Sequence, residues 1–280
     1  MVSFTGRLLT ALILAPMPLA AQETIALVTD VSGKAYFYVG QVLGITAAIP
    51  AQQTLTLEPG CRLVLVHVKT GEEFTFQGPC KLRFNAEGRP EGAKPQSVKK
   101  PIALQGSIRI KPESLAQASL VLREVDTRAS AVSSGFTPRG PVLLDPLPEF
   151  RWHTAGANAT YRLDLTGPDG SLLLDLSLEE NHLKLPEHLA LVDGLSYAWR
   201  LHTTINGEVQ TESGKFKLLP KLQRDQLQAA SPKEGASFSE RLVYAALLEQ
   251  LEIRDEARTH WKTLAKERPG EEALKALSEK

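Results

Sequence analysis

The feature that most constrains the fold is an alternation of apolar and polar residues, with a period of two, between residues 141 and 220. It is clearest in residues 161–165 and 197–201, where leucine and aromatic side chains occupy every second position. Similar segments recur about every 10 residues, separated by turn residues such as Gly170 and Gly207. The alternation places apolar side chains on one face of each strand, and the spacing predicts an antiparallel β-sandwich.

The N-terminal part, residues 22–85, predicts a second β-unit made of shorter strands. Its candidate strands are rich in β-branched and aromatic residues and are bounded by Gly, Pro or Asn; they are residues 25–28, 35–39, 62–68, 73–76 and 81–84. Apolar side chains occupy both faces of residues 62–68, which is typical of a strand covered on both sides. Gly71 lies in a predicted hairpin turn.

The first 21 residues have the order of a secretory signal peptide. Arg7 supplies the positive charge, residues 8–19 are almost wholly apolar, and Ala20 and Ala21 precede the expected cleavage site. We therefore expect a periplasmic protein cleaved near Ala21; the alternative is a buried N-terminal helix. No later stretch approaches the roughly 18 apolar residues of a membrane-spanning helix, so we expect no transmembrane anchor.

The two cysteines of the chain, Cys61 and Cys80, are predicted to form a disulfide, because an even pair in an exported protein is most simply explained in this way. A disulfide closing a loop of about 20 residues stabilises the folded state by roughly 3 kcal/mol. A metal or redox pair is the alternative, although no CxxC spacing supports it.

Residues 86–140 are expected to form a basic linker and an extension of the first β-unit. Residues 81–111 contain eight Lys or Arg, against only Glu87 and Glu91. Gly, Pro and Lys crowd residues 88–101, a composition typical of a solvated linker; contact with an anionic envelope polymer is the alternative. Further strands or helices are expected in two segments: residues 102–110 predict a strand, and residues 114–123 fit a strand or a short helix equally well.

The N-terminal β-unit resembles the FecR-type extracytoplasmic β-domain. The matching positions are spaced valines, a leucine-glycine turn and later glycines: Val28, Val31, Gly33, Leu57, Gly60, Gly71 and Gly78-Pro79. Regulators of that name also have a cytoplasmic segment that binds a sigma factor, followed by a membrane helix. Neither segment is expected here, so the resemblance implies the β-fold without the regulation of a sigma factor.

Residues 141–220 resemble a bacterial fibronectin type III-like, immunoglobulin-like domain. The resemblance depends on Pro148, Phe150, Trp152, residues 161–165, Gly194, Tyr197 and Trp199. It implies that Trp152 and Trp199 are core residues, whereas stacking against a sugar ring is their alternative role.

The C-terminal residues 221–280 change to a helical period. Ser237 or Ser239 is predicted to cap a helix that ends near Gln250, and further helices are predicted at residues 256–267 and 271–278. The segment resembles a single tetratricopeptide-type hairpin, on the residues Ala245, Ala257, Trp261 and Pro269. Because a lone hairpin must bury its apolar face elsewhere, we expect it to pack against the sandwich or to dock a partner.

No recognisable catalytic, cofactor-binding or metal-binding residues are found in the sequence. The six histidines form no HExxH motif, and neither a GxSxG elbow nor a phosphate-binding glycine loop occurs. Lys plus Arg and Asp plus Glu number 32 each, so the chain has no net charge that would attract nucleic acid.

These patterns predict a mainly β protein with a FecR-like β-domain (residues 22–85), a fibronectin type III-like sandwich (residues 141–220) and a small C-terminal helical hairpin (residues 221–280). We expect a non-enzymatic interaction or scaffold protein of the bacterial envelope, with a protein partner bound through the C-terminal helices. The alternative is a carbohydrate- or peptidoglycan-binding module that uses the basic residues 81–111 and an exposed aromatic side chain.

Overall fold

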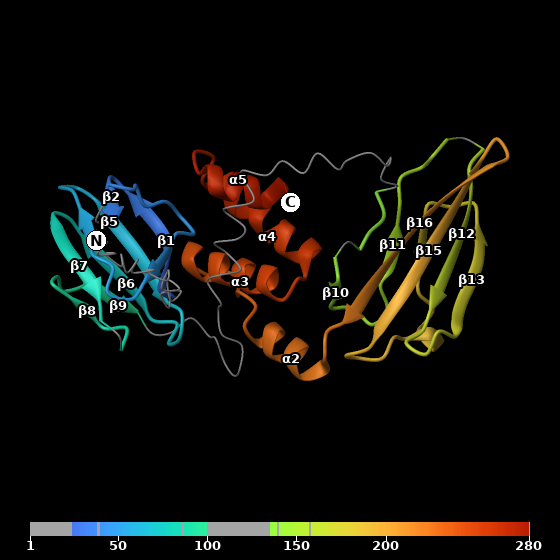
Figure 1. Cartoon of the computed structure of the whole chain (residues 1–280), viewed down its shortest axis with the longest axis horizontal. Coiled ribbons are helices and arrows are strands. Elements are labelled where there is room, and N and C mark those ends of the chain that lie inside the picture. Colours follow the sequence, from blue (N-terminus) through green and yellow to red (C-terminus); the bar gives the residue numbers. More distant parts are fainter. Residues whose placement is uncertain are drawn as a thin grey trace, which may run out of the picture.

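The computed structural model describes residues 24–37, 40–85, 87–99, 135–138, 140–156 and 158–279. These residues form a mainly β architecture in which several sheets are followed by four helices (Figure 1). The predicted signal peptide and the predictions for residues 102–110 and 114–123 lie outside the described residues.

The N-terminal β-unit consists of two antiparallel sheets. The first sheet has the order β3 (Ala48–Pro50), β1 (Thr24–Ser32), β5 (Arg62–His67), β6 (Glu73–Gln77) and β9 (Ser97–Lys99). The second has the order β2 (Ala35–Phe37), β4 (Leu55–Leu57), β7 (Cys80–Phe84) and β8 (Pro90–Glu91). Each of the five predicted strands is present. The three-residue strands β3 and β4 were missed, because so short a segment shows no periodicity.

Two strands lie where the composition predicted a linker. Strand β9 pairs with β6, and β8 pairs with β7, so residues 90–99 extend the first β-unit. The core between the two sheets contains Phe74, Phe76 and Phe84, whose rings meet at centroid distances of 5.9 to 6.5 Å.

The second β-unit is a sandwich, as predicted in outline. Its main sheet has the order β10 (Val142–Leu143), β16 (Glu208–Leu218), β15 (Ser196–Ile205), β12 (Thr160–Thr166) and β13 (Leu172–Leu178). The smaller sheet pairs β11 (Glu149–Arg151) with β14 (His182–Lys184), and a 3-10 turn η2 (Glu187–Leu189) follows it. Strand β10 runs parallel to β16, and the other pairs are antiparallel.

The hairpin of β15 and β16 is longer than the alternation predicted, because residues 208–211 of β16 are exposed on both faces and show no alternation in burial. Its turn is Asn206-Gly207, and both residues have positive φ, 53° and 87°. An Asn-Gly pair is favoured in such a two-residue turn because these residues tolerate that conformation.

The C-terminal residues form α2 (Lys221–Ala229), α3 (Phe238–Gln250), α4 (Arg254–Glu267) and α5 (Glu272–Glu279). Helix α3 begins as predicted: the Ser237 side chain accepts from the Glu240 backbone N–H, and the Glu240 carboxylate accepts from the Ser237 N–H. This capping box satisfies two backbone donors that the first helical turn leaves free. Helix α2 was not predicted.

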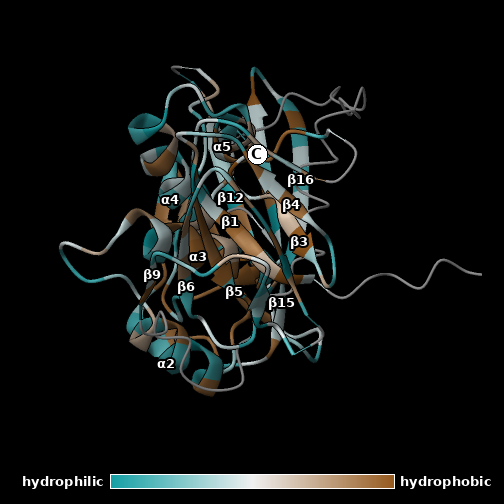
Figure 2. Ribbon diagram, turned by 90° about the vertical axis from the view of Figure 1, so that its left-hand side faces the viewer, coloured by the Kyte–Doolittle hydropathy of each residue, from teal (hydrophilic) through white to brown (hydrophobic). Residues whose placement is uncertain are grey.

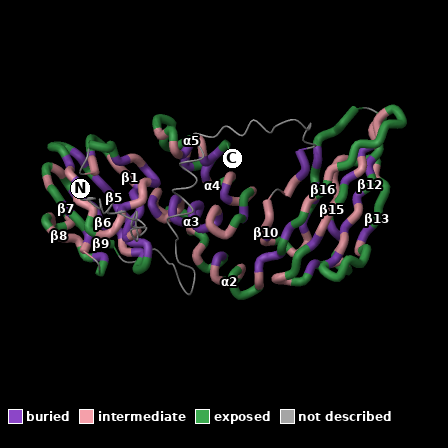
Figure 3. The backbone as a smooth tube through the Cα atoms, viewed as in Figure 1, coloured by how far each residue is buried: buried purple, intermediate pink, exposed green. Residues whose placement is uncertain are grey.

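Helix α3 is apolar around its whole circumference over residues 242–248, and its buried residues are Ser239, Leu242, Val243, Tyr244, Ala245, Ala246, Leu247 and Leu248. Such a helix must be covered on all sides. It is the most continuously buried helix in Figure 3 and lies between β1 and helix α4 in Figure 1.

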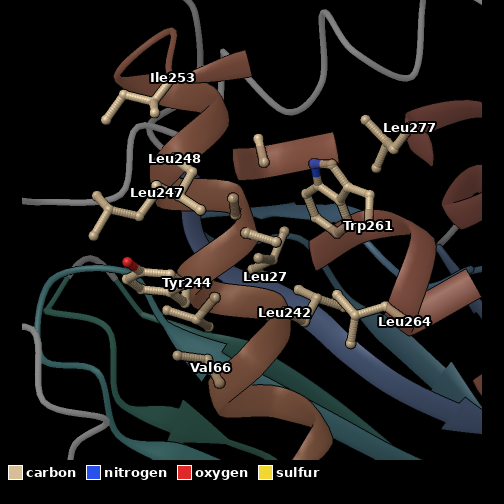
Figure 4. Close-up of a cluster of buried hydrophobic side chains, with 14 of the residues drawn as sticks. Leu27, Val66, Leu242, Tyr244, Leu247, Leu248, Ile253, Trp261, Leu264 and Leu277 are labelled. Carbon is tan, nitrogen blue, oxygen red and sulfur yellow. The ribbon is translucent and has the colours of Figure 1, made fainter. Parts of the chain in front are cut away.

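The helices bury their apolar surface against the first sheet of the N-terminal unit. Leu27 of β1 and Val66 of β5 belong to the same hydrophobic cluster as Leu242, Trp261 and Leu264 (Figure 4). The sequence predicted packing on the sandwich or on a partner, and contact with the N-terminal sheet was not predicted. This contact also explains the apolar residues on both faces of β5, since Leu65 belongs to the core between the sheets and Val66 to the core beneath the helices.

The same helices contact the sandwich. Val142 and Leu144 pack against the helical cluster, and Arg224 of α2 binds both carboxylate oxygens of Asp193 at 2.5 and 2.9 Å. Figure 2 colours much of α3, β1 and β5 as hydrophobic, and residues of all three belong to one cluster. The C-terminal helices therefore join two β-units that precede them in the chain.

Candidate interaction edge at strand β13

Strand β13 forms one edge of the main sandwich sheet. It pairs with β12 over its full length, and in the described part of the chain no strand pairs with its other side. The remaining outermost strands of the described four- and five-stranded sheets, β2, β3, β8, β9 and β10, span only two or three residues each. Among the described residues, all seven of β13 thus lack a strand on their outer side; residues 208–216 of β16, beyond the two residues that pair with β10, also lack one.

The inward-facing side chains of β13 are leucines. Leu174 lies opposite Leu165, Leu176 opposite Leu163, and Leu178 opposite Tyr161. The partner residues are buried in the sandwich core. Leu176 nevertheless remains 39% exposed, because no strand covers it on the outer side.

The outward-facing carboxylate of β13, Asp175, forms an ion pair with Arg162 of the neighbouring strand β12. Arg162 donates from Nε and Nη2 to the two carboxylate oxygens of Asp175, at 2.7 and 2.6 Å. These hydrogen bonds are the largest cause of a lowered pKa for Asp175. Asp175 lies directly opposite Asp164, and Arg162 also lies 3.5 Å from Asp164, so one guanidinium offsets the repulsion between two acids.

A polar row continues this network across the outer face. His202 lies with Nε2 at 3.3 Å from an oxygen of Asp164 and with Nδ1 at 2.9 Å from the hydroxyl of Thr211. The row ties β12, β15 and β16 together beside β13. The edge strand is therefore held on a rigid sheet, and its one acid is already paired.

The sequence did not single out Leu176, Asp175 or Arg162. Residues 171–176 are one of the recurring apolar segments that predict strands between residues 141 and 220, but the position of that strand within a sheet depends on pairings that no local pattern contains. The available signal was the scarcity of charge, since Asp175 is the one charged residue among the seven of β13.

The two cysteines lie close to each other in the N-terminal unit. Both are free thiols in the structure, Cys61 buried and Cys80 half-buried, so the disulfide predicted from the sequence is not formed there. Burial raises the pKa of both thiols, and the charge of Cys80 adds to the rise at Cys61. Gly33 packs against Cys61, since a Cβ at Gly33 would lie 2.9 Å from the Cys61 Cα.

The two tryptophans of the sandwich pack against its core. Trp152 is 3% exposed. Trp199 is half-buried; its ring stacks on Phe136 at a centroid distance of 3.8 Å, and a Cβ at Gly214 would lie 2.8 Å from its ring atoms. Core packing is therefore confirmed for Trp152, and the indole of Trp199 is flanked by Phe136 and the Gly214 backbone.

The basic segment at residues 81–111 is partly neutralised by acidic side chains. Among its described residues, Arg83 pairs with Glu91 at 3.0 Å, and Lys99 pairs with the buried Glu73 at 2.9 Å. These pairs tie β7 to β8 and β6 to β9, so they contribute to the sheets rather than to a continuous cationic surface.

The described residues contain no group of three or more His, Cys, Asp or Glu placed to hold a metal ion. Within the same residues, every helix is too short or too polar to cross a membrane. No protein-family model and no curated protein matches the sequence.

Proposed function

We propose that this chain is a non-enzymatic interaction or scaffold protein of the bacterial cell envelope, and that the edge of β13 is its docking element. The observation that carries the proposal is the unpaired seven-residue edge with an exposed leucine, Leu176. An unpaired edge presents a row of backbone N–H and C=O groups that an added strand satisfies. Side chains along the edge, such as Leu176, then contact the side chains of the added strand and so determine which strands bind.

The role of the C-terminal helices follows from their packing. Most of the large apolar side chains of α3, α4 and α5 are buried within the chain, so the partner-binding role expected of them is not part of the proposal. We assign them instead the role of a rigid spacer, which holds the free edge of the sandwich at a defined distance from the FecR-like unit.

The FecR-like and fibronectin type III-like identities are retained as part of the proposal. They are supported by the quoted sequence motifs and by two β-units with separate cores. Export to the periplasm is retained on the sequence of residues 1–21 alone.

The test is affinity capture from envelope extract with the full chain, the variant Leu176→Lys and the matched control Leu222→Lys. Leu222 lies on α2 and is 69% exposed, so its replacement adds the same charge far from the edge. We expect a partner retained by the wild type and the control but lost with Leu176→Lys, while thermal stability is unchanged. Equal capture by all three proteins, or turnover of an envelope substrate, would contradict the proposal.

A carbohydrate- or peptidoglycan-binding module is the second candidate, favoured by one observation. A hollow of about 460 Å³ beside Trp199 is lined in part by Phe136, Pro138, Lys215 and Arg254, which together offer apolar and cationic contacts. Binding of peptidoglycan fragments that is lost in Lys215→Glu but not in Leu176→Lys would favour this candidate. No binding by the wild type would exclude it for the fragments tested.

A further inference from the structure

We infer that the strand which pairs with the β13 edge is β13 of a second copy of this chain, so that two sandwich sheets join across a two-fold axis. This inference rests on the proposed function, because it names the partner of that same edge. It is argued from the order of residues along β13 and from the direction in which each side chain points.

The five residues 174–178 read Leu-Asp-Leu-Ser-Leu, and their leucines are symmetric about Leu176. In an antiparallel pair related by a two-fold axis perpendicular to the sheet, directly opposite side chains lie on the same face. The two-fold axis must therefore lie midway between the two copies of one residue, so that this residue is opposite itself. Centred on Leu176, it places Leu176 opposite its own copy and Leu174 opposite Leu178 of the second copy.

The polar positions are complementary in the same register. Asp175 lies opposite Ser177 of the second copy, and the relationship occurs twice by symmetry. A serine hydroxyl donates and a carboxylate accepts, so each Asp175 gains a donor besides Arg162. Centring the axis on Asp175 would instead place two carboxylates opposite each other, which is destabilising.

The flanking residues limit the pairing to this short segment. The register of β12 and β13 shifts between Leu165 and Thr166, opposite Leu174 and Leu172, which marks a bulge at one end. Glu179 and Glu180 follow the other end. Charges and bulges restrict edge-to-edge pairing in natural sheets. We therefore expect a discrete dimer rather than an open-ended assembly.

The dimer should be weak. Five paired residues bury far less than the roughly 1,200 Å² of a stable protein–protein interface. The dissociation constant of the dimer should lie between about 1 µM and about 1 mM, the range of the weaker protein complexes. Leu176→Lys should weaken it about tenfold or more, since two like charges would then lie directly opposite each other.

The decisive experiment is oxidative cross-linking of the full-length variants Leu176→Cys and Leu172→Cys. In the inferred register the two copies of residue 176 are directly opposite, at a separation compatible with a disulfide. The two copies of residue 172 are more than about 20 Å apart along the strands. Leu172 is 60% exposed, so its variant is the more accessible of the two and controls for random collision.

We expect a covalent dimer with Leu176→Cys and none with Leu172→Cys, mapped by mass spectrometry to exclude Cys61 and Cys80. Sedimentation of the wild type should show the matching reversible dimer. Equal cross-linking of both variants, or a wild type that is monomeric throughout, overturns the self-pairing.

A further arm separates this inference from the proposed function. The same Leu176→Cys variant is exported in cells, and its disulfide adducts are identified. An adduct with a different envelope protein and no homodimer would overturn self-pairing but retain β13 as a docking edge. No adduct of either kind would overturn both.

Discussion

The hydroxyl of Ser239 donates a hydrogen bond of 2.9 Å to the hydroxyl of Thr29, joining helix α3 to strand β1 across 210 residues of sequence. Thr29 in turn lies 3.4 Å from the carbonyl oxygen of Val64 and is fully buried. This polar contact lies within an otherwise apolar interface. It fixes the position of the helix on the sheet, because a buried hydroxyl that loses its partner is destabilising.

We predict that Thr29→Val lowers the free energy of unfolding by about 1–3 kcal/mol, because the Ser239 hydroxyl is left buried without its acceptor. The double variant Thr29→Val with Ser239→Ala should recover most of the loss, since both polar partners are then removed. Urea denaturation measures the two values. Additive losses in the double variant would show that the hydrogen bond does not couple α3 to β1.

Trp261 is the largest fully buried side chain of the helical cluster. Trp261→Ala should lower the free energy of unfolding by about 3–5 kcal/mol, as expected for removal of a buried aromatic side chain. Leu222→Ala, at a 69% exposed position, is the control and should change it by less than about 0.5 kcal/mol.

The shared cluster also predicts how the N-terminal unit responds to Trp261→Ala. Because Leu27 and Val66 belong to the same core as Trp261, loosening the helices should also increase hydrogen exchange in β1 and β5. Hydrogen exchange with mass spectrometry tests this directly. Unchanged protection of both strands would mean that the sheet is stable without its helical cover.

His67 makes stability depend on pH. It is buried, its Nδ1 accepts a hydrogen bond from the Thr70 backbone N–H at 3.0 Å, and burial lowers its pKa. The unfolded chain takes up a proton as the pH falls through about 6.5, while the folded protein does not. The contribution of His67 is therefore complete above that pH and is lost as the pH falls toward the folded pKa.

Two measurements check this prediction. Nuclear magnetic resonance titration of the His67 ring should give a pKa below the value of about 6.5 for a histidine in an unfolded chain, and urea midpoints should fall on acidification below about pH 6.5. A His67 ring that titrates at or above about pH 6.5 would contradict the buried neutral state.

The two cysteines can be present as free thiols, as in the structure, or as a disulfide. We predict that protein purified from an oxidising compartment contains the Cys61–Cys80 disulfide. When this protein is unfolded in the absence of a reductant, neither cysteine should react with a thiol reagent. Reduction should release two reactive thiols and lower the thermal midpoint. Two thiols that react without reduction would show that the free form of the structure persists after export.

Much of the secondary structure could be predicted because its signals are local. The period of two in residues 161–165 and 197–201 located β12 and β15, and the serine of the capping box located the start of α3. Strands β3, β4, β8 and β9 were missed because two or three residues carry no period. Helix α2 was missed because Pro220 provides no side-chain cap and few of its residues are buried.

The candidate site was much less predictable than these elements. Neither Leu176 nor Arg162 has a distinctive local context, and their importance comes from the edge position of β13. Trp152 and Trp199, which are conspicuous in the sequence, proved to be packed against the sandwich core.

The sequence by itself determined the longer strands, the helices α3, α4 and α5, and which of their faces are apolar, because these properties depend on residues two to four positions apart. Only the tertiary structure decided what covers each apolar face. Helix α3 covers β1 and β5, and β13 has strand β12 on one side alone. Hydrophobic attraction has no direction and does not specify a partner, so shape and pairing across distant segments make that choice.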